Sequence, residues 1–280
     1  MTRPMLRIVI LCVAAVLLVA LILWIWHGNT VVGETDVTVR SRKLPAAFSG
    51  FRIAQVSDLH NASFGSGNQR LAKMLEEAHP DLIAVTGDLI DSDHRTDAAL
   101  ALMEQAVRIA PVYYVTGNHE AKAESYPAFE ECLREAGVQV LHHRSVLLTR
   151  GGEQLRLIGL DDPAFAGLPP EEAAGQALSE LAPGDGLYTL LLSHRPDLLD
   201  LYAAHPVDLV LSGHAHGGQV RLPGIDGLYA PNQGVFPKLA SGVHQQNGTT
   251  LIVSRGLGHN PFLFRVNNPP ELVVVTLETE

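Results

Sequence analysis

The chain has only two cysteines among its 280 residues, and charged and aromatic side chains are also scarce, at 18% and 6%. Cys12 lies in an apolar N-terminal stretch and Cys132 in a predicted helix, so the sequence indicates no disulfide framework. Basic residues number 20 against 30 acidic ones, which gives a formal charge of −10. Because proteins that coat nucleic acids carry a basic face, this balance disfavours nucleic acid as a partner.

Linkers, repeats and charge blocks are missing from most of the chain. Apolar residues make up 46% of it, which is typical of a globular protein with a sizeable core rather than a disordered or fibrous one. After residue 48, no Pro/Gly/Ser-rich stretch and no block of like charge interrupts the sequence. We therefore expect residues 46–280 to form one domain, and residues 28–45 to be a linker that holds one strand at 36–40.

Residues 8–26 carry no charge and form nineteen consecutive apolar residues, long enough to cross the hydrocarbon core of a bilayer. A cleaved signal peptide is the alternative, but its apolar region is normally about 7–15 residues and ends in a small-x-small cleavage site. Residues 24–27 offer no such site, and Trp24 and Trp26 stand where an interfacial aromatic belt would fall. We expect residues 1–27 to be a cytoplasmic tip followed by a single-pass transmembrane helix that anchors the chain.

The basic residues beside the expected anchor bear on its orientation. Arg3 and Arg7 precede it and favour a cytoplasmic N-terminus. Arg40, Arg42 and Lys43 follow it closely and weaken that bias. We expect the domain at residues 46–280 to lie outside the cytoplasm.

Apolar runs of strand length recur along the domain and are separated by turns or by amphipathic stretches of helical period. The predicted strands are 52–57, 82–86, 112–116, 155–159, 189–192, 209–211, 251–254 and 272–277. The predicted helices are 68–78, 97–109, 127–135, 171–181 and 196–203. Several strands are near-continuous apolar runs, which indicates that both of their faces are covered. The pattern predicts an α/β sandwich of two sheets covered by helices.

Polar clusters follow the ends of five predicted strands. The clusters are Asp58-Leu59-His60, Gly87-Asp88, Gly117-Asn118-His119-Glu120, Ser193-His194 and Ser212-Gly213-His214-Ala215-His216-Gly217. Each alone fits a turn or a surface histidine, but strand ends at one edge of a sheet converge in space. Together they offer neutral nitrogen, amide oxygen and carboxylate ligands, which borderline and hard divalent cations prefer, without the thiolates of a structural zinc site. The sequence therefore predicts a two-metal hydrolase.

The order of these clusters resembles the calcineurin-like metallophosphoesterase superfamily. Shorter matches resemble its membrane-associated branch of YkuE/YaeI-type phosphodiesterases, and they lie at residues 87–91, 213–219, 254–258 and 268–271. The resemblance covers residues 46–280. It implies a four-layer αββα sandwich of two mixed sheets, preceded by the N-terminal transmembrane helix.

The resemblance also implies two divalent metal ions, which the donor set suits as Mn²⁺, Fe²⁺ or Zn²⁺. The implied ligands are Asp58, His60 and His216 for the first ion, Asn118, His194 and His214 for the second, and Asp88 for both. A carboxylate suits the bridging position because its two oxygens can bind separate cations. The implied mechanism is attack by a metal-bridging hydroxide on phosphorus, with the non-ligand His119 as the catalytic group that steadies charge and protonates the leaving oxygen.

Four further polar residues have both a functional and a structural interpretation. Glu120 either orients the imidazole of His119 or is an exposed loop carboxylate. Arg255 either pairs with substrate phosphate or forms a surface ion pair. Asp161 either faces substrate or makes an Asx turn, and Asp91 either hydrogen-bonds to a side chain that binds metal or caps a helix.

An anchored hydrolase samples the membrane surface, and tethering raises the effective concentration of substrates borne by lipids. We therefore expect a phosphodiesterase or pyrophosphatase that acts on lipid-linked or envelope substrates. A phosphomonoesterase of small soluble phosphates is the alternative enzyme. A catalytically silent membrane-bound binding module is an alternative of another class, although the complete ligand set speaks against it. The acidic balance disfavours a nuclease.

Overall fold

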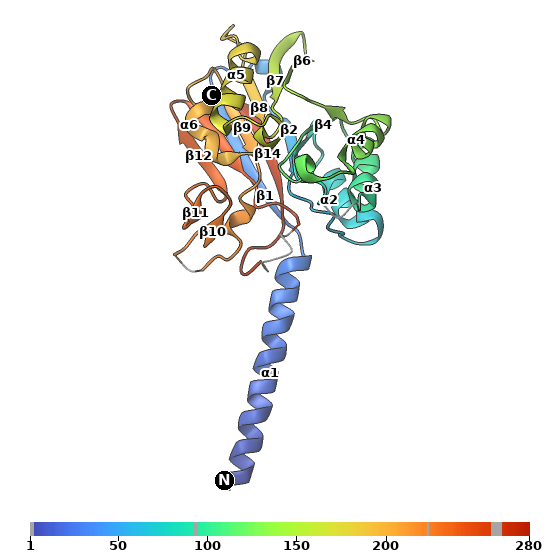
Figure 1. Ribbon diagram of the computed structural model, residues 1–280, viewed down its shortest axis with the longest axis vertical. Helices are drawn as coiled ribbons and strands as arrows, with labels where there is room; N and C mark the ends of the chain where they lie inside the picture. The colour runs from blue at the N-terminus through green and yellow to red at the C-terminus, as the bar shows by residue number, and fades with distance from the viewer. Residues whose placement is uncertain (1–2, 92–94, 223, 259–264) are drawn as a thin grey trace.

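The computed structural model describes residues 3–91, 95–222, 224–258 and 265–280. Two six-stranded sheets form the centre of the domain (Figure 1). In spatial order the first sheet holds β1 Gly33–Ser41, β14 Glu271–Thr279, β2 Phe51–Val56, β3 Leu82–Thr86, β4 Val112–Val115 and β5 Gln139–Val140. The second holds β12 Gly242–Gln246, β13 Thr249–Val253, β9 Leu209–Ser212, β8 Thr189–Leu192, β7 Glu153–Gly159 and β6 Arg144–Arg150. A separate short pair joins β10 Tyr229–Ala230 to β11 Gly234–Val235.

Side chains that alternate along the strands divide the apolar interior into three layers. On β3, Ala84 packs in the core between the sheets, whereas Val85 faces the helices α2 Gln69–Glu77, α3 Asp97–Ala106 and α4 Tyr126–Glu135. On β8, Leu190 packs between the sheets, whereas Leu191 faces α5 Pro170–Leu181 and α6 Leu199–Tyr202. Both sheets contain parallel and antiparallel pairs. The predicted four-layer αββα sandwich of two mixed sheets is confirmed.

The segment expected to be a linker requires a correction. The helix α1 Arg3–Thr30 continues beyond residue 27, and β1 pairs in parallel with β14 along its whole length. Residues 33–41 therefore belong to the first sheet rather than to a linker, and the strand expected at 36–40 is longer at both ends. The sequence understates β1 because an edge strand whose side chains are mostly exposed or half-buried needs no continuous apolar run.

The strands β6 and β12, unlike β1, are not among the predicted strands. Each lies at an edge of the second sheet, pairs with one antiparallel neighbour and carries mostly exposed or half-buried side chains. The helix predicted at 196–203 is divided into a 3₁₀ turn at Pro196–Leu198 and the short α6. Edge strands and short turns depend on contacts that a periodic pattern does not report.

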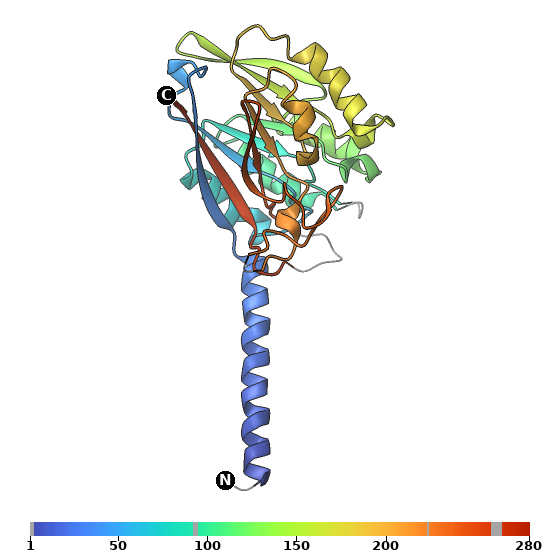
Figure 2. The same cartoon turned by 90° about the vertical axis from the view of Figure 1, so that its left-hand side faces the viewer.

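The N-terminal helix α1 stands away from the domain (Figures 1 and 2), and its described side chains are almost all exposed. It has 28 residues, and the mean hydropathy of its most apolar window is 3.4. By length and composition it is the single helix among the described residues that could cross a membrane. An N-terminal signal sequence meets the same criterion.

Strand directions place the polar loops at the end of the domain nearest α1. β1 begins three residues after α1 ends, at Gly33. β14 runs parallel to β1 and antiparallel to β2, so the carboxyl ends of β2 and its parallel neighbours β3 and β4 return toward α1. Gln55 Nε2 donates to Ser212 O at 2.9 Å and holds the end of β9 against β2. The loops after both sets of strands therefore open on the end from which α1 leaves.

Candidate metal centre

The loops after β2, β3, β8 and β9 bring six of the seven predicted ligands into two groups. In each group the ligand atoms lie within 4.8 Å of one another. The first group is Asp58, His60, Asp88 and His216, and the second is Asp88, His194 and His214. All six residues are buried. Asp88 belongs to both groups, which is the geometry that a bridging carboxylate requires.

One ring nitrogen of each histidine in these groups faces a ring nitrogen of another histidine. His60 Nε2 lies 3.3 Å from His216 Nε2, and His214 Nδ1 lies 3.1 Å from His194 Nε2. Asp88 Oδ2 lies 3.2 Å from His194 Nε2 and 3.5 Å from His60 Nε2. Two neutral imidazoles whose lone pairs converge repel each other unless a proton or a cation lies between them. Convergent nitrogens beside carboxylate oxygens are the arrangement of metal ligands.

Asn118, the seventh predicted ligand, lines the same cavity as Asp88 and His214. Its side-chain oxygen Oδ1 is buried and has no hydrogen-bond partner. A buried acceptor without a partner is uncommon because it forfeits its hydrogen bonds to water. The unpartnered oxygen therefore fits a place beside a divalent cation, and the donor set as a whole fits such ions without selecting one.

The backbone of the cluster is held in conformations that most residues avoid. Five of the predicted ligands have positive φ, between 45° and 67°: Asp58, His60, Asp88, His214 and His216. Such conformations cost about 1–2 kcal/mol for each non-glycine residue, and they gather where function demands a particular side-chain direction. Gly117 allows the β3 and β4 loops to meet, because a Cβ atom there would overlap Asp88 Oδ1.

Charges within the cluster compensate one another. Burial penalises ionised Asp88, but His194 and His60 outweigh it and hold the pKa of Asp88 well below its ordinary value. Burial lowers the pKa of His194, but Asp88 and Asp58 outweigh burial and raise it to about 10. Burial holds the pKa of His214 well below its ordinary value. A buried imidazolium therefore neutralises a buried carboxylate, a task that a bound cation would take over while releasing the proton.

His119, the predicted catalytic group, projects into a cavity of about 290 Å³ beside the ligands. Its Nε2 lies 4.0 Å from Asp88 Oδ2, and its Nδ1 lies 2.5 Å from Asp91 Oδ1. Asp91 Oδ1 also lies 3.3 Å from His60 Nδ1. Burial would raise the pKa of Asp91, but His119 and His60 outweigh it and lower that pKa far below its ordinary value. Asp91 therefore orients both imidazoles. This contact agrees with its functional interpretation rather than with the helix cap.

Glu120 is 1% exposed, so its interpretation as an exposed loop carboxylate is wrong. Its carboxylate accepts backbone N–H groups on both oxygens, from Asp88, Leu89, Ile90 and Gly117 at 2.7–3.2 Å. Burial and then Asp88 raise the pKa of Glu120 to about 7, against the lowering effect of these backbone bonds. Glu120 ties the β3 loop to the β4 loop, whereas Asp91 holds the ring of His119.

Arg195 is a residue of the site that the sequence analysis missed. Its Nε and Nη2 donate to Asp162 at 2.6 and 3.1 Å, and its Nη1 lies 3.5 Å from His214 Nε2. Burial opposes its charge, but Asp162 outweighs burial and raises the pKa of Arg195. The guanidinium is fixed, charged and part of the cavity wall. Its position directly after the predicted ligand His194 is the signal that could have identified it.

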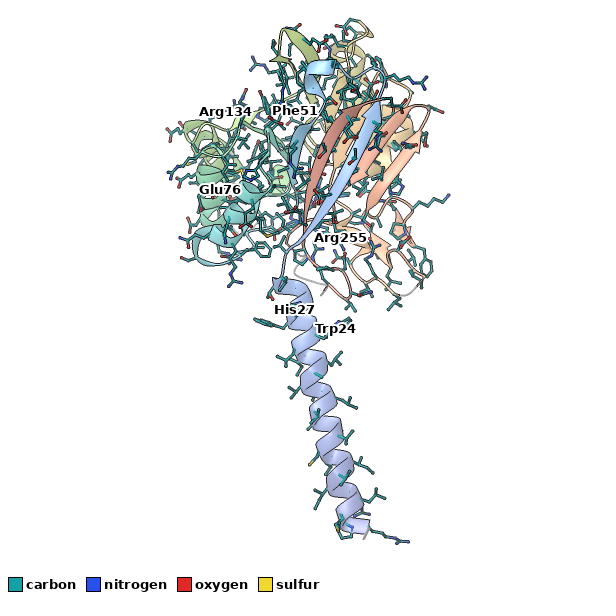
Figure 3. The ribbon with its side chains drawn as sticks, turned by 180° about the vertical axis from the view of Figure 1, so that it is seen from behind. Trp24, His27, Phe51, Glu76, Arg134 and Arg255 are labelled. Carbon is teal, nitrogen blue, oxygen red and sulfur yellow. The ribbon has the colours of Figure 1, made fainter. Side chains whose placement is uncertain are left out.

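The side chains of Asp161 and Arg255 bind partners outside the cavity. Asp161 Oδ1 accepts from Thr116 Oγ1 at 3.0 Å and lies 2.8 Å from His142 Nδ1. Arg255 pairs with Glu271 at 2.8 Å, but the two side chains are only 20% and 7% exposed, so this ion pair is not the surface pair of its second interpretation. Figure 3 shows Arg255 at the end of the domain near His27 of α1. Neither residue lines the cavity beside the metal ligands.

Proteins of known family match most of this chain. The metallophosphoesterase YkuE of Bacillus subtilis is 30% identical over 89% of this chain and 86% of that protein. The phosphodiesterase YaeI of Escherichia coli is 28% identical over 81% of this chain and 82% of that protein. The UDP-2,3-diacylglucosamine pyrophosphatase LpxG of Chlamydia muridarum is 24% identical over 93% of this chain and 94% of that protein.

The fold and the ligand-bearing segment agree with these similarities. The crystal structure of TT1561 of Thermus thermophilus shares the fold, with a TM-score of 0.53 at 15% identity over 75% of this chain and 91% of that chain. The family description "Calcineurin-like phosphoesterase" matches residues 51–218. That segment contains all seven predicted metal ligands and His119. The chain therefore belongs to the calcineurin-like phosphoesterase family and is a phosphoric ester hydrolase.

Proposed function

We propose that this hydrolase is a membrane-anchored, two-metal phosphodiesterase or pyrophosphatase whose substrates are borne by lipids or by the envelope. The observation that carries the proposal is the pair of ligand groups that share Asp88. In this proposal Asp58, His60 and His216 hold one ion, and Asn118, His194 and His214 hold the other. When bound, two divalent ions supply an activated water near neutral pH and neutralise the oxygens of the phosphoryl group.

His119 is the proposed general acid. Asp91 holds its Nδ1, which leaves Nε2 directed into the cavity. A proton on Nε2 can therefore pass to the oxygen of the leaving group as the ester bond breaks, a step that typically contributes about 10²–10⁴-fold to the rate. Asp91 keeps the ring from rotating away, because its carboxylate is itself fixed between His119 and His60.

A fixed cation next to the predicted ligands supports a pyrophosphate, which carries a second anionic phosphoryl group. The guanidinium of Arg195, held by Asp162, and the ammonium of Lys122 line the cavity beside the metal ligands. The anionic oxygens of that second phosphoryl group need a partner beyond the two metals. Guanidinium groups bind such oxygens through paired, charge-assisted hydrogen bonds.

The expected membrane anchor and two of the relatives support a lipid-borne substrate. The helix α1 is long and apolar enough to span a bilayer. YaeI is named a phosphodiesterase, and LpxG is named a pyrophosphatase of a diacylglucosamine nucleotide. A tether to the bilayer raises the local concentration of substrates that share it. The proposal includes a location of the domain outside the cytoplasm.

The full chain in detergent with Mn²⁺ tests the chemistry. We expect it to hydrolyse bis-p-nitrophenyl phosphate faster than p-nitrophenyl phosphate. The variants Asp88→Asn and His119→Asn should lose most of the activity, and the matched variant His143→Asn, at an exposed histidine, should retain it. Undiminished turnover in His119→Asn would contradict its assigned role. Faster turnover of the monoester would favour the phosphomonoesterase, and fewer than one bound ion per chain would favour the silent binding module.

A further inference from the structure

Exposed apolar side chains gather on the β10–β11 hairpin and on the loop before it. We call them the apolar rim, and they are Leu222, Leu228, Tyr229, Val235 and Phe236, with exposed fractions of 39–62%. Tyr229 pairs directly with Val235, and Phe236 N donates to Leu228 O at 3.0 Å, so four of the five occupy neighbouring rungs of one ladder. Exposed apolar side chains that gather on one hairpin indicate a surface that meets a partner or a membrane.

The same hairpin forms a wall of the cavity beside the metal ligands. Pro231 and Asn232, at its turn, line that cavity together with His119 and His214. Asn232 Oδ1 lies 3.2 Å from His214 Nε2. A molecule held at the apolar rim therefore lies next to the entrance of the site.

The apolar rim lies at the end of the domain from which α1 leaves, as both views of the ribbon show (Figures 1 and 2). The topology explains this placement. The carboxyl ends of β2, β3 and β4 return toward α1 because β2 is antiparallel to β14, and β14 is parallel to β1. The hairpin belongs to the long connection between β9 and β12, which leaves the sandwich at the same edge.

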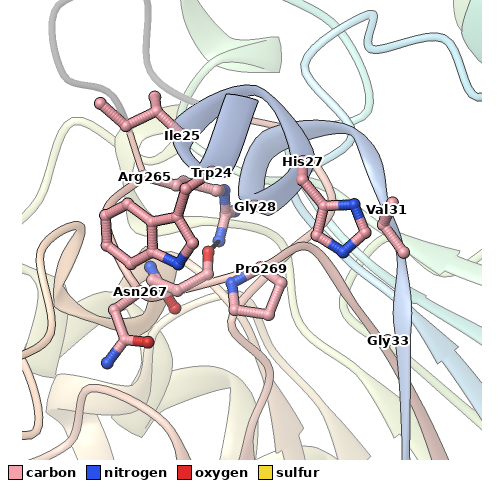
Figure 4. A pocket seen from close by; sticks show the side chains of 10 residues that line it. Trp24, Ile25, His27, Gly28, Val31, Gly33, Arg265, Asn267 and Pro269 are labelled. Atoms are coloured by element: carbon pink, nitrogen blue, oxygen red, sulfur yellow. Dashed lines mark hydrogen bonds between the residues drawn. The ribbon is translucent and has the colours of Figure 1, made fainter. Parts of the chain in front are cut away.

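The last turn of α1 is held against this end of the domain. Asn29 Nδ2 donates to Arg265 O at 2.9 Å, and Arg265 N donates to Asn29 Oδ1 at 3.1 Å. Figure 4 shows Trp24 and His27 of the helix beside Asn267 and Pro269 of the domain. Because tryptophan favours the membrane–water interface, Trp24 sets the level of that interface close to this end of the domain.

We propose that the apolar rim rests on the lipid surface into which α1 inserts, so that the cavity receives phosphodiester or pyrophosphate head groups directly from the bilayer. The proposal rests on the proposed function, since it takes α1 as a membrane anchor. The acyl chains of the substrate stay among the lipids and the apolar rim, while the phosphate enters between Asn232 and the metal ligands. The apolar rim is thus a lipid-contacting surface, and its partner is the membrane itself.

Two esters with the same leaving group separate lipid contact from chemistry. The full chain in phosphatidylcholine vesicles with Mn²⁺ is assayed on bis-p-nitrophenyl phosphate and on a diacylglycerol p-nitrophenyl phosphodiester mixed into the vesicles. For Val235→Ser/Phe236→Ser we expect roughly fivefold or greater loss on the lipid ester, because apolar area is withdrawn from lipid, and unchanged turnover of the soluble ester. Leu147→Ser, at an exposed position on β6 at the far end of the domain, should change neither rate. Equal loss on both esters, or no loss, would overturn the proposal.

A second measurement does not depend on catalysis. A fluorophore is attached at Val235→Cys in a chain that also carries Cys12→Ser and Cys132→Ser, and vesicles contain lipids with a nitroxide quencher near the head group. We expect strong quenching at position 235 and little at a matched Leu147→Cys label. Equal quenching at both positions would contradict the proposal that the apolar rim contacts lipid. If instead the wild-type chain with Mn²⁺ cleaves neither ester while position 235 is quenched, the proposed function fails and the lipid contact stands.

Discussion

Replacing Glu120 by glutamine tests the hydrogen bonds that hold the β3 and β4 loops together. The carboxylate accepts four buried N–H groups, two on each oxygen. A glutamine amide offers one oxygen, so two of the four N–H groups would face the donors of its NH₂ group. Each buried N–H without an acceptor costs about 1–3 kcal/mol, which gives a loss of about 2–6 kcal/mol in the free energy of unfolding.

Thermal unfolding of the full chain in detergent, followed by circular dichroism, measures this loss. A change of about 1 kcal/mol shifts Tm by about 2–4 °C in a domain of this size, so we expect Glu120→Gln to lower Tm by at least about 4 °C. Metal binding should weaken as well, because the four N–H groups lie in the loops that carry Asp88 and Asn118. The exposed Glu124, in the same loop, provides the control Glu124→Gln. A Tm for Glu120→Gln equal to that of the control would refute the reasoning.

Three other predictions follow from contacts outside the ligand set. Arg195→Lys should lower kcat/KM for bis-p-nitrophenyl phosphate by roughly tenfold, since a paired guanidinium bond is lost, whereas Arg134→Lys on the surface of α4 (Figure 3) should not; equal kcat/KM in both would contradict the role of Arg195. Hydrogen bonding to Asp161 outweighs burial and raises the pKa of His142 to about 9. The stabilisation from protonated His142 is therefore complete below about pH 6.5 and disappears as the pH rises through 9. His142→Ala should lower Tm at pH 6 but not at pH 10, and an equal effect at both pH values would contradict this. A chain that starts at residue 46 lacks β1 and exposes the edge of β14, so size-exclusion chromatography should show aggregation that a chain starting at residue 31 avoids; monodisperse behaviour of both would show that β1 is dispensable.

The convergence of the predicted ligands could be inferred from the sequence because each lies in a loop after a strand with a clear apolar run. Asp58, Asp88 and His194 each lie two residues after the last residue of such a strand, and parallel strands bring their carboxyl ends to one edge. Burial on both faces makes those strands continuous in hydrophobicity, so their ends are well marked. The same apolar strands predict the fold class, a sandwich of two sheets covered by helices.

The supporting residues could not be predicted because tertiary contacts alone decide their roles. Asp161 and Asp162 are adjacent and chemically identical, yet one bonds to Thr116 and the other holds Arg195. Glu120 depends on the meeting of the β3 and β4 loops, which local spacing does not report. β1 was understated for a related reason, since its pairing with β14 joins segments more than two hundred residues apart.

The measurement that tests the central claim most directly is a crystal structure of the full chain grown with Mn²⁺, with anomalous scattering recorded to locate the ions. We expect two anomalous peaks on either side of Asp88, one among Asp58, His60 and His216 and the other among Asn118, His194 and His214. Absence of peaks at Asp88, or a single ion bound by other residues, would contradict the two-metal site.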